Sequence, residues 1–298
     1  DWTYTGLDTA VVIASFPFVE GNTYRLLVRA IDVAGNLSAA FSGDGFLIDY
    51  TVPETGMVFD GLSGDPVYTG SDTTIDAHWS GFADDVSGIA YYEAALGSAP
   101  QSTEIVDWTS ALADTFVTMD SLTLISGETY YLSVRAFDVA GNTSAVVSSS
   151  GITVDTEPPA QGLVHDGAAA DLDWSNQDSS LTAFWTTFTD LLSGTKDYSI
   201  SIGTAVGQDD VYALTSVGDT NMAVFDGLVL EEATTYFFNV IATDSVDNAS
   251  LPVSSDGITI DRTAPATVMD LDYYYYGPDR WDGTPDPLSG VASDELSG

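Results

Sequence analysis

The sequence repeats itself with a period of 106 residues, and this period limits the fold more than any other feature of the chain. The pentapeptide Asp-Val-Ala-Gly-Asn at 32–36 returns unchanged at 138–142, and 244–248 keep its first and last residues. Other residues keep the same register: Tyr24, Tyr130 and Tyr236; Asp49, Asp155 and Asp261; Pro53, Pro159 and Pro265. A repeat of about 100 residues is long enough to own a hydrophobic core, which a solenoid unit of about 20–50 residues is not. The sequence therefore predicts tandem domains.

Within each repeat, apolar residues alternate along short segments. One side of the segment 130–137 carries Tyr130, Leu132, Val134 and Ala136, and the other carries Tyr131, Ser133, Arg135 and Phe137. A period of two predicts a half-buried strand here, and the same alternation predicts strands over 24–30 and 236–242. Further β-rich stretches lie at 74–79, 88–96, 116–124 and 146–155, separated by Gly, Asp and Ser clusters. No helical periodicity is present, so the sequence predicts an all-β fold.

These segments resemble a known family. Trp79, the segment 88–92 and the segment 127–136 are similar to a fibronectin type III domain. The resemblance implies tandem Ig-like or fibronectin type III-like β-sandwich domains, in which Tyr24, Tyr130 and Tyr236 hydrogen-bond back to the preceding corner. The Asp-x-Ala-Gly-Asn-x-Ser loop and the linker 154–159 resemble the Ig-like extender repeats of large bacterial surface adhesins. The third copy departs from this pattern at 245–247 and has Ala233 where the second has Gly127.

The repeat also predicts the domain organisation. Residues 54–158 and 160–264 are expected to form complete β-sandwich repeats, whereas 1–52 match the C-terminal half of a repeat and 266–298 the start of a further one. The linkers between them are short and contain proline, which makes them semi-rigid. The chain is therefore expected to be a window on a longer, rod-like array.

The charge of the chain excludes several functions. Six Lys and Arg residues stand against 45 Asp and Glu, a formal net charge of −39, which excludes a nucleic-acid binder and disfavours an anionic membrane surface. Hydrophobic residues make up 44% of the chain, so it is expected to fold, and no apolar run is long enough to cross a bilayer. Cysteine is absent and His78 and His165 are the two histidines, so neither a disulfide nor a zinc cluster is expected.

Short carboxylates beside turns and linkers suit calcium, which binds six to eight oxygen ligands. The resemblance places such ions at domain junctions, and the candidate ligands are Asp32, Asn36, Asp49, Asp138, Asn142, Asp155, Asp244, Asn248 and Asp261. The alternative is that these residues cap turns through side-chain to backbone hydrogen bonds. For Asp84 and Asp190, each followed by a Ser-Gly pair, a strand-joining turn is favoured over a metal site. Adaptation to salty water is a second explanation of the acidity.

The expected function is mechanical rather than catalytic. The residues that do not repeat, such as His78, His165 and Trp174, are too isolated to form a catalytic constellation. We expect a non-catalytic stalk of a large extracellular or cell-surface protein, stiffened by calcium, whose partners are the neighbouring repeats of the same chain. Two alternatives remain: a self-associating filament formed with other copies, and a module that binds surface glycans or proteins.

Two sequence motifs have competing interpretations. Asn36, Asn142 and Asn248 each begin an N-glycosylation sequon, but turn hydrogen bonds explain the same residues and are favoured. Tyr273–Tyr276 and Trp281 form an unrepeated aromatic group, for which packing in the core of the next domain is favoured over glycan binding.

Overall fold

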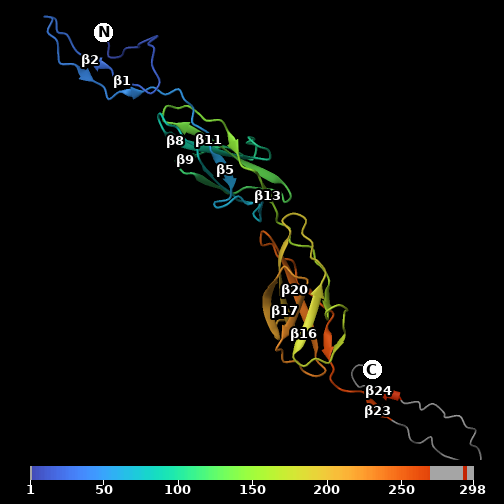
Figure 1. Ribbon diagram of the computed structural model, residues 1–298. Coiled ribbons are helices and arrows are strands. Elements are labelled where there is room, and N and C mark those ends of the chain that lie inside the picture. The colour runs from blue at the N-terminus through green and yellow to red at the C-terminus, as the bar shows by residue number, and fades with distance from the viewer. Residues whose placement is uncertain (1, 269–290, 294–298) are drawn as a thin grey trace, which may run out of the picture. The chain divides into compact units, whose positions relative to one another are not determined.

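A computed structural model describes residues 2–268 and 291–293 of the chain. The described part is all-β, and it divides into two compact units, Asp1–Val154 and Asp155–Gly298 (Figure 1). In the described residues, no helix exists that is long and apolar enough to span a membrane. The predicted all-β fold class is therefore confirmed.

The first unit contains one complete sandwich. Its strands are β5 (Met57–Asp60), β6 (Tyr68–Thr69), β7 (Ile75–Ser80), β8 (Ile89–Gly97), β9 (Val106–Leu112), β10 (Phe116–Met119), β11 (Thr129–Asp138), β12 (Val147–Ser148) and β13 (Ile152–Val154). A three-stranded sheet has the order β10-β7-β5, and a six-stranded sheet has the order β6-β13-β11-β8-β9 with β12 paired to β11. All pairs are antiparallel except β6 with β13. This is a fibronectin type III-like β-sandwich, as the resemblance implies.

The core of this sandwich lies between the two sheets. In β11, Tyr130, Leu132, Val134 and Ala136 are buried, as the alternation predicts. They pack with Trp79 and Ile75 of β7, so Trp79 is a core residue. Full burial of each large apolar side chain contributes about 1.5–3 kcal/mol, which makes this face the main source of stability.

The prediction of one continuous strand over 146–155 is wrong. These residues form two short strands, β12 and β13, because the segment between them leaves the ladder. Gly151 there has a φ of +100°, and an added Cβ would lie 2.6 Å from a ring carbon of Tyr131. The strand predicted over 116–124 is likewise shorter, since β10 ends at Met119.

The second unit contains a sandwich of the same order. Its strands are β14 (Val164–Asp166), β15 (Trp174–Ser175), β16 (Ser180–Trp185), β17 (Thr195–Gly203), β18 (Tyr212–Gly218), β19 (Met222–Asp226), β20 (Thr235–Asp244), β21 (Val253–Ser254) and β22 (Ile258–Ile260). The sheets are β14-β16-β19 and β15-β22-β20-β17-β18, with β21 paired to β20. The two sandwiches thus share one topology, and the second has its own core around Trp185, Phe188 and Phe238.

The tyrosine hydrogen bonds implied by the resemblance are present in all three copies. The Tyr24, Tyr130 and Tyr236 hydroxyls accept the N–H groups of Val19, Ile125 and Glu231 at 3.0, 3.0 and 2.7 Å. The third-copy departures keep the backbone conformation, because Ala233 and Asp247 have positive φ values of 58° and 71°, like the glycines they replace.

The segment before the first sandwich departs from expectation. It forms four two-residue strands: β1 (Thr23–Tyr24), β2 (Leu27–Val28), β3 (Phe41–Ser42) and β4 (Phe46–Leu47), paired as β1-β4 and β2-β3. The half-buried strand predicted over 24–30 is wrong here, since Leu26 is 46% and Val28 58% exposed. Tyr24 packs against Phe16, Phe18 and Phe46, but neither Leu26 nor Val28 belongs to a buried core cluster among the described residues.

The other end of the chain is described only in part. Strands β23 (Ala266–Val268) and β24 (Val291–Ser293) pair antiparallel. Most of the predicted start of a further repeat at 266–298, including Tyr273–Tyr276 and Trp281, lies outside the described residues.

Candidate metal centre

The repeated Asp-to-Asn loop is held by its own side chains. Asp138 Oδ1 accepts the backbone N–H of Asn142 at 2.8 Å, and Asp138 Oδ2 accepts its side-chain amide at 2.8 Å. The pairs Asp32–Asn36 and Asp244–Asn248 repeat both bonds within 0.1 Å. These are the turn hydrogen bonds that the capping interpretation predicts, and they occupy the amide nitrogen of each sequon asparagine.

In the two complete repeats, the same asparagine also hydrogen-bonds to the segment that precedes the sandwich. The Asn142 amide donates to the backbone carbonyl of Asp49 at 3.3 Å, and the Asn248 amide donates to that of Asp155 at 2.9 Å. Asp49 and Asp155 are thereby brought against the loops that hold Asp138 and Asp244.

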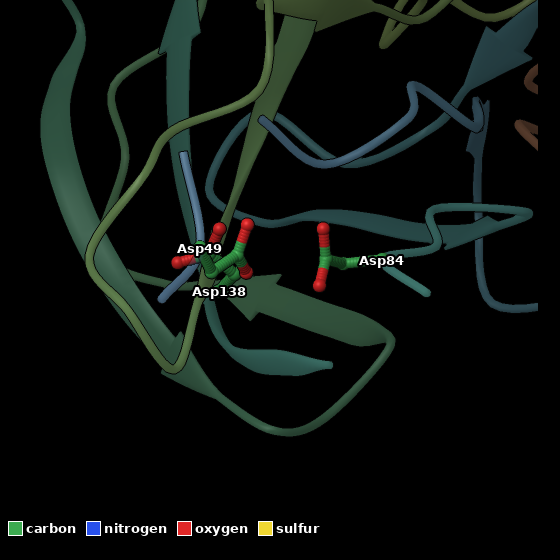
Figure 2. A group of neighbouring side chains, drawn as sticks. All are labelled: Asp49, Asp84 and Asp138. Carbon is green, nitrogen blue, oxygen red and sulfur yellow. The ribbon is translucent and has the colours of Figure 1, made fainter. Parts of the chain in front are cut away.

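Three carboxylates converge in the first unit, and we call Asp49, Asp84 and Asp138 the first triad. One oxygen from each lies within 4.8 Å of the others. Figure 2 shows the Asp84 side chain extending toward those of Asp49 and Asp138. Asp49 is 7% and Asp138 2% exposed. The chain therefore brings two buried aspartates, from a linker and the end of β11, together with the half-buried Asp84 of a turn.

Asp84 divides its two carboxylate oxygens between two roles. Its Oδ1 accepts the N–H groups of Val86, Ser87 and Gly88 at 3.2, 2.7 and 2.9 Å, which is the turn predicted from the sequence. Burial raises the pKa of Asp84, but these N–H donors together outweigh it and hold the pKa below its usual value. Asp84 is therefore ionised at neutral pH.

The first triad has two buried oxygens without a partner. They are Asp84 Oδ2 and Asp49 Oδ2. Leaving a buried polar atom unsatisfied costs about 1–3 kcal/mol, and more for a charged group. Such atoms in a native protein call for an explanation, and a bound cation supplies one.

The second unit has an equivalent cluster, the second triad, formed by Asp155, Asp190 and Asp244. One oxygen from each again lies within 4.8 Å of the others, and Asp155 and Asp244 are fully buried. Asp190 Oδ1 accepts the N–H groups of Leu192 and Gly194 at 3.0 and 2.7 Å, while Asp155 Oδ2 accepts that of Ser193 at 3.1 Å. The buried Ser193 hydroxyl has no partner.

Among the described residues, no ion pair joins a basic side chain to either triad. Within the described ranges, the ion pairs join Arg135 to Glu93, Lys196 to Asp247 and Arg262 to Glu232, and His165 contacts Asp171. Two unit charges 4.8 Å apart repel by about 0.9 kcal/mol in water and by about 3.5 kcal/mol at an effective dielectric constant of 20. A donor set made only of oxygens favours a hard divalent cation.

The remaining predicted ligands lie elsewhere. Asp32 and Asn36 bond to each other in an exposed loop, where the Asn36 amide and N–H lower the pKa of Asp32. Asp261 Oδ1 accepts the N–H of Thr263 at 2.9 Å, and neither Asp32 nor Asp261 joins a carboxylate cluster among the described residues. Asp84 and Asp190 are the triad members missing from the predicted ligand set, although their shared register, 106 residues apart, was a signal for them.

Comparison with known proteins gives one curated relative and a set of distant structures. Exoglucanase B of Cellulomonas fimi is 28% identical in an alignment 277 residues long, which covers 89% of this chain and 22% of the relative, so the chain spans about a fifth of its length. The chicken CNTN1 FN1-FN3 domains are 16% identical, with a TM-score of 0.35 and coverage of 79% of this chain and 77% of theirs. Domains A168-A170 from titin are 17% identical, with a TM-score of 0.42 and coverage of 80% and 75%. No protein-family model matches.

Proposed function

We propose that the chain is a non-catalytic stalk segment of a larger extracellular or cell-surface protein, stiffened by one calcium ion at each triad. The observation that carries the proposal is the recurrence of a three-carboxylate cluster, with two buried members and one half-buried member, at equivalent positions of two successive repeats. Turn capping alone accounts for one oxygen of Asp84 and leaves the other buried and unpaired.

Calcium fits the triads better than the other common ions. Its 2.3–2.6 Å ligand distances and irregular geometry tolerate oxygens from separate loops, whereas magnesium demands near-octahedral geometry and zinc prefers nitrogen and sulfur. Backbone carbonyls and water would complete the six to eight ligands. A Ca²⁺ ion leaves each triad with one net negative charge in place of three.

Stiffening follows from where the triad residues lie along the chain. Asp155 comes directly after Val154, the last residue of β13, whereas Asp190 and Asp244 belong to the following sandwich. An ion held by all three would tie Asp155, the residue that directly follows the preceding sandwich, to two residues of the following sandwich. The proline-containing linkers 154–159 and 260–265 already limit the freedom of these segments.

The extracellular setting rests on two observations. The chain resembles the extender repeats of bacterial surface adhesins in its loop and linker motifs. It also aligns with a part of an exoglucanase that is much longer than itself, as a module of a multi-domain protein would.

The test compares calcium with magnesium at constant ionic strength. The chain is first freed of bound ions with EDTA, and the EDTA is then removed. In about 0.5 M NaCl, millimolar Ca²⁺ should raise the melting temperature and increase the maximum dimension in small-angle scattering, and Mg²⁺ at the same concentration should do neither. The variant Asp84→Asn/Asp190→Asn should lose the increase in maximum dimension and show a smaller rise in melting temperature, because the Asn carbonyl can keep the turn bonds but cannot bind the ion as strongly. Asp114→Asn, an exposed turn residue, is the matched control. If the wild type and the double variant respond equally to calcium, the proposal is wrong.

A further inference from the structure

A third carboxylate cluster lies at the other end of the second sandwich. It consists of Asp166, the last residue of β14, Asp171 in the following loop, and Asp256 just before β22. The start of β22 pairs with the start of β20, since Tyr236 lies opposite Ile258, whereas Asp244 of the second triad ends β20. At about 3.3 Å per residue, the length of β20 separates this cluster from the second triad.

Asp166 is the buried centre of this cluster. It is fully buried, its Oδ2 accepts the N–H of Gly257 at 3.0 Å, and its own N–H donates to Asp171 Oδ1 at 2.9 Å. Its Oδ1 is buried and has no partner. One oxygen each of Asp166, Asp171 and Asp256 lie within 4.8 Å of one another.

The electrostatics of the cluster are unfavourable without a cation. Burial raises the pKa of Asp166 to about 6, and the charges of Asp171 and Asp256 add to the rise, against the Gly257 N–H and the nearby Ser255 side chain. Among the described residues, the one contact of this cluster with a basic side chain is from His165, whose Nδ1 lies 3.2 Å from Asp171 Oδ2. One histidine does not neutralise three carboxylates.

The first sandwich provides a natural comparison. There, Gly151 N–H donates to Asp60 Oδ2 at 3.0 Å and Asp60 N–H donates to Asp65 Oδ1 at 2.9 Å, the same bonds as in the second sandwich. The position of Asp256 is occupied by Ser150, whose hydroxyl lies 3.4 Å from both Asp60 and Asp65. One sandwich therefore has three carboxylates at this end and the other has two and a hydroxyl.

We propose that Asp166, Asp171 and Asp256 bind a divalent calcium ion, at a site separate from both triads. The full burial of Asp166 with an unpaired oxygen, beside two exposed carboxylates, gives one inner ligand and two that close over the ion from solvent. In the set Asp60, Asp65 and Ser150, Asp60 Oδ1 is likewise buried without a partner, but the third charge is missing, so we expect no calcium binding there at millimolar concentration. This site does not depend on the function proposed above.

Calorimetric titration of the full chain with Ca²⁺ in about 0.5 M NaCl tests the number of sites. Asp256→Ser, which copies the set of the first sandwich, should lose one bound ion per chain and keep those of the triads. Asp84→Asn/Asp190→Asn should keep the ion that Asp256→Ser loses. Unchanged stoichiometry in Asp256→Ser would overturn the proposal, whatever the triads bind.

The two histidines give a local readout in the folded chain. His165 contacts Asp171, and His78 Nδ1 lies 2.8 Å from the Gly61 carbonyl, next to Asp60 in the first sandwich. Calcium should shift the NMR signals of the His165 ring and leave those of His78 unchanged. In Ser150→Asp, which completes the carboxylate set of the first sandwich, the His78 signals should respond as well. If calcium does not shift the His165 signals in the wild type, or shifts them equally in Asp256→Ser, the proposed site is wrong.

Discussion

Single aspartates in this chain do two things at once, one with each carboxylate oxygen. Asp84 caps a turn through Oδ1 and leaves Oδ2 in the first triad, and Asp166 binds Gly257 N–H through Oδ2 and leaves Oδ1 unpaired. Capping and metal binding were opposed as interpretations of the sequence, but a carboxylate has enough lone pairs for both. A turn-capping bond is therefore no evidence against a ligand.

The pH response of Asp60 is a prediction at this scale. Burial raises the pKa of Asp60, against hydrogen bonds from Ser149 and Gly151. Below the unfolded pKa of about 4, Asp60 is protonated in both the folded and the unfolded state. Between the unfolded pKa and the raised folded pKa, Asp60 is ionised in the unfolded state only, so the wild type loses stability as the pH rises through this interval. The stability of Asp60→Asn relative to wild type should therefore increase with pH above about 4.

Thermal unfolding between pH 3 and 8 in EDTA checks this prediction. The stability of the exposed control Asp114→Asn relative to wild type should depend on pH much less than that of Asp60→Asn. A relative stability of Asp60→Asn that falls as the pH rises would contradict the sign.

At the scale of elements, serine hydroxyls hold the broken edge of each larger sheet. Between β12 and β13, the Ser149 hydroxyl accepts the N–H of Leu132 at 3.1 Å, and its own N–H donates to the Leu132 carbonyl at 2.8 Å. Ser255 makes the same two bonds to Phe238 of β20, at 3.0 and 2.9 Å. The side chain thus replaces a backbone acceptor where the strand leaves the ladder.

Removing this hydroxyl should destabilise the sandwich. Ser149→Ala leaves the buried N–H of Leu132 without an acceptor, at a cost of about 1–3 kcal/mol. Ser255→Ala should cost a similar amount in the second sandwich, and the exposed Ser80→Ala should cost little. Calorimetry of the three variants checks this; a loss in Ser149→Ala no larger than in Ser80→Ala would show that the edge needs no such acceptor.

At the scale of the whole molecule, the two sandwiches have separate cores. The cluster around Trp79 draws its residues from Val58 to Val154, and the cluster around Trp185 draws its residues from Val164 to Ile260. The boundaries 54–158 and 160–264 remain predictions, and independent unfolding is what they require.

Matched core substitutions test that independence. Leu132→Ala and Ile200→Ala each remove a fully buried side chain, from β11 and β17, and should cost about 2–5 kcal/mol. Each substitution should lower the melting temperature of one calorimetric transition and leave that of the other unchanged. If either variant moves both transitions equally, the two sandwiches unfold as one unit and the predicted boundaries are wrong.

The net charge of −39 sets the response to salt. Monovalent salt shortens the Debye length from about 30 Å at 0.01 M to about 10 Å at 0.1 M, so it screens repulsion between exposed carboxylates. Without calcium, the melting temperature should rise steeply over this range and then level off. Melting curves at increasing NaCl check this; a melting temperature insensitive to salt would show that the acidic surface is not under repulsive strain.

The sequence alone determined the repeat, the all-β fold and the buried face of β11, because strand periodicity and tandem register are properties of the chain itself. It also identified Asp49, Asp138, Asp155 and Asp244 as candidate ligands. Only the tertiary structure decided that Asp84 and Asp190 join them, that the strand after β11 is broken, and that Asp166 lies beside Asp256. Residues about 90 positions apart meet only through the pairing of sheets, and a carboxylate in a turn carries no local sign of what its second oxygen faces.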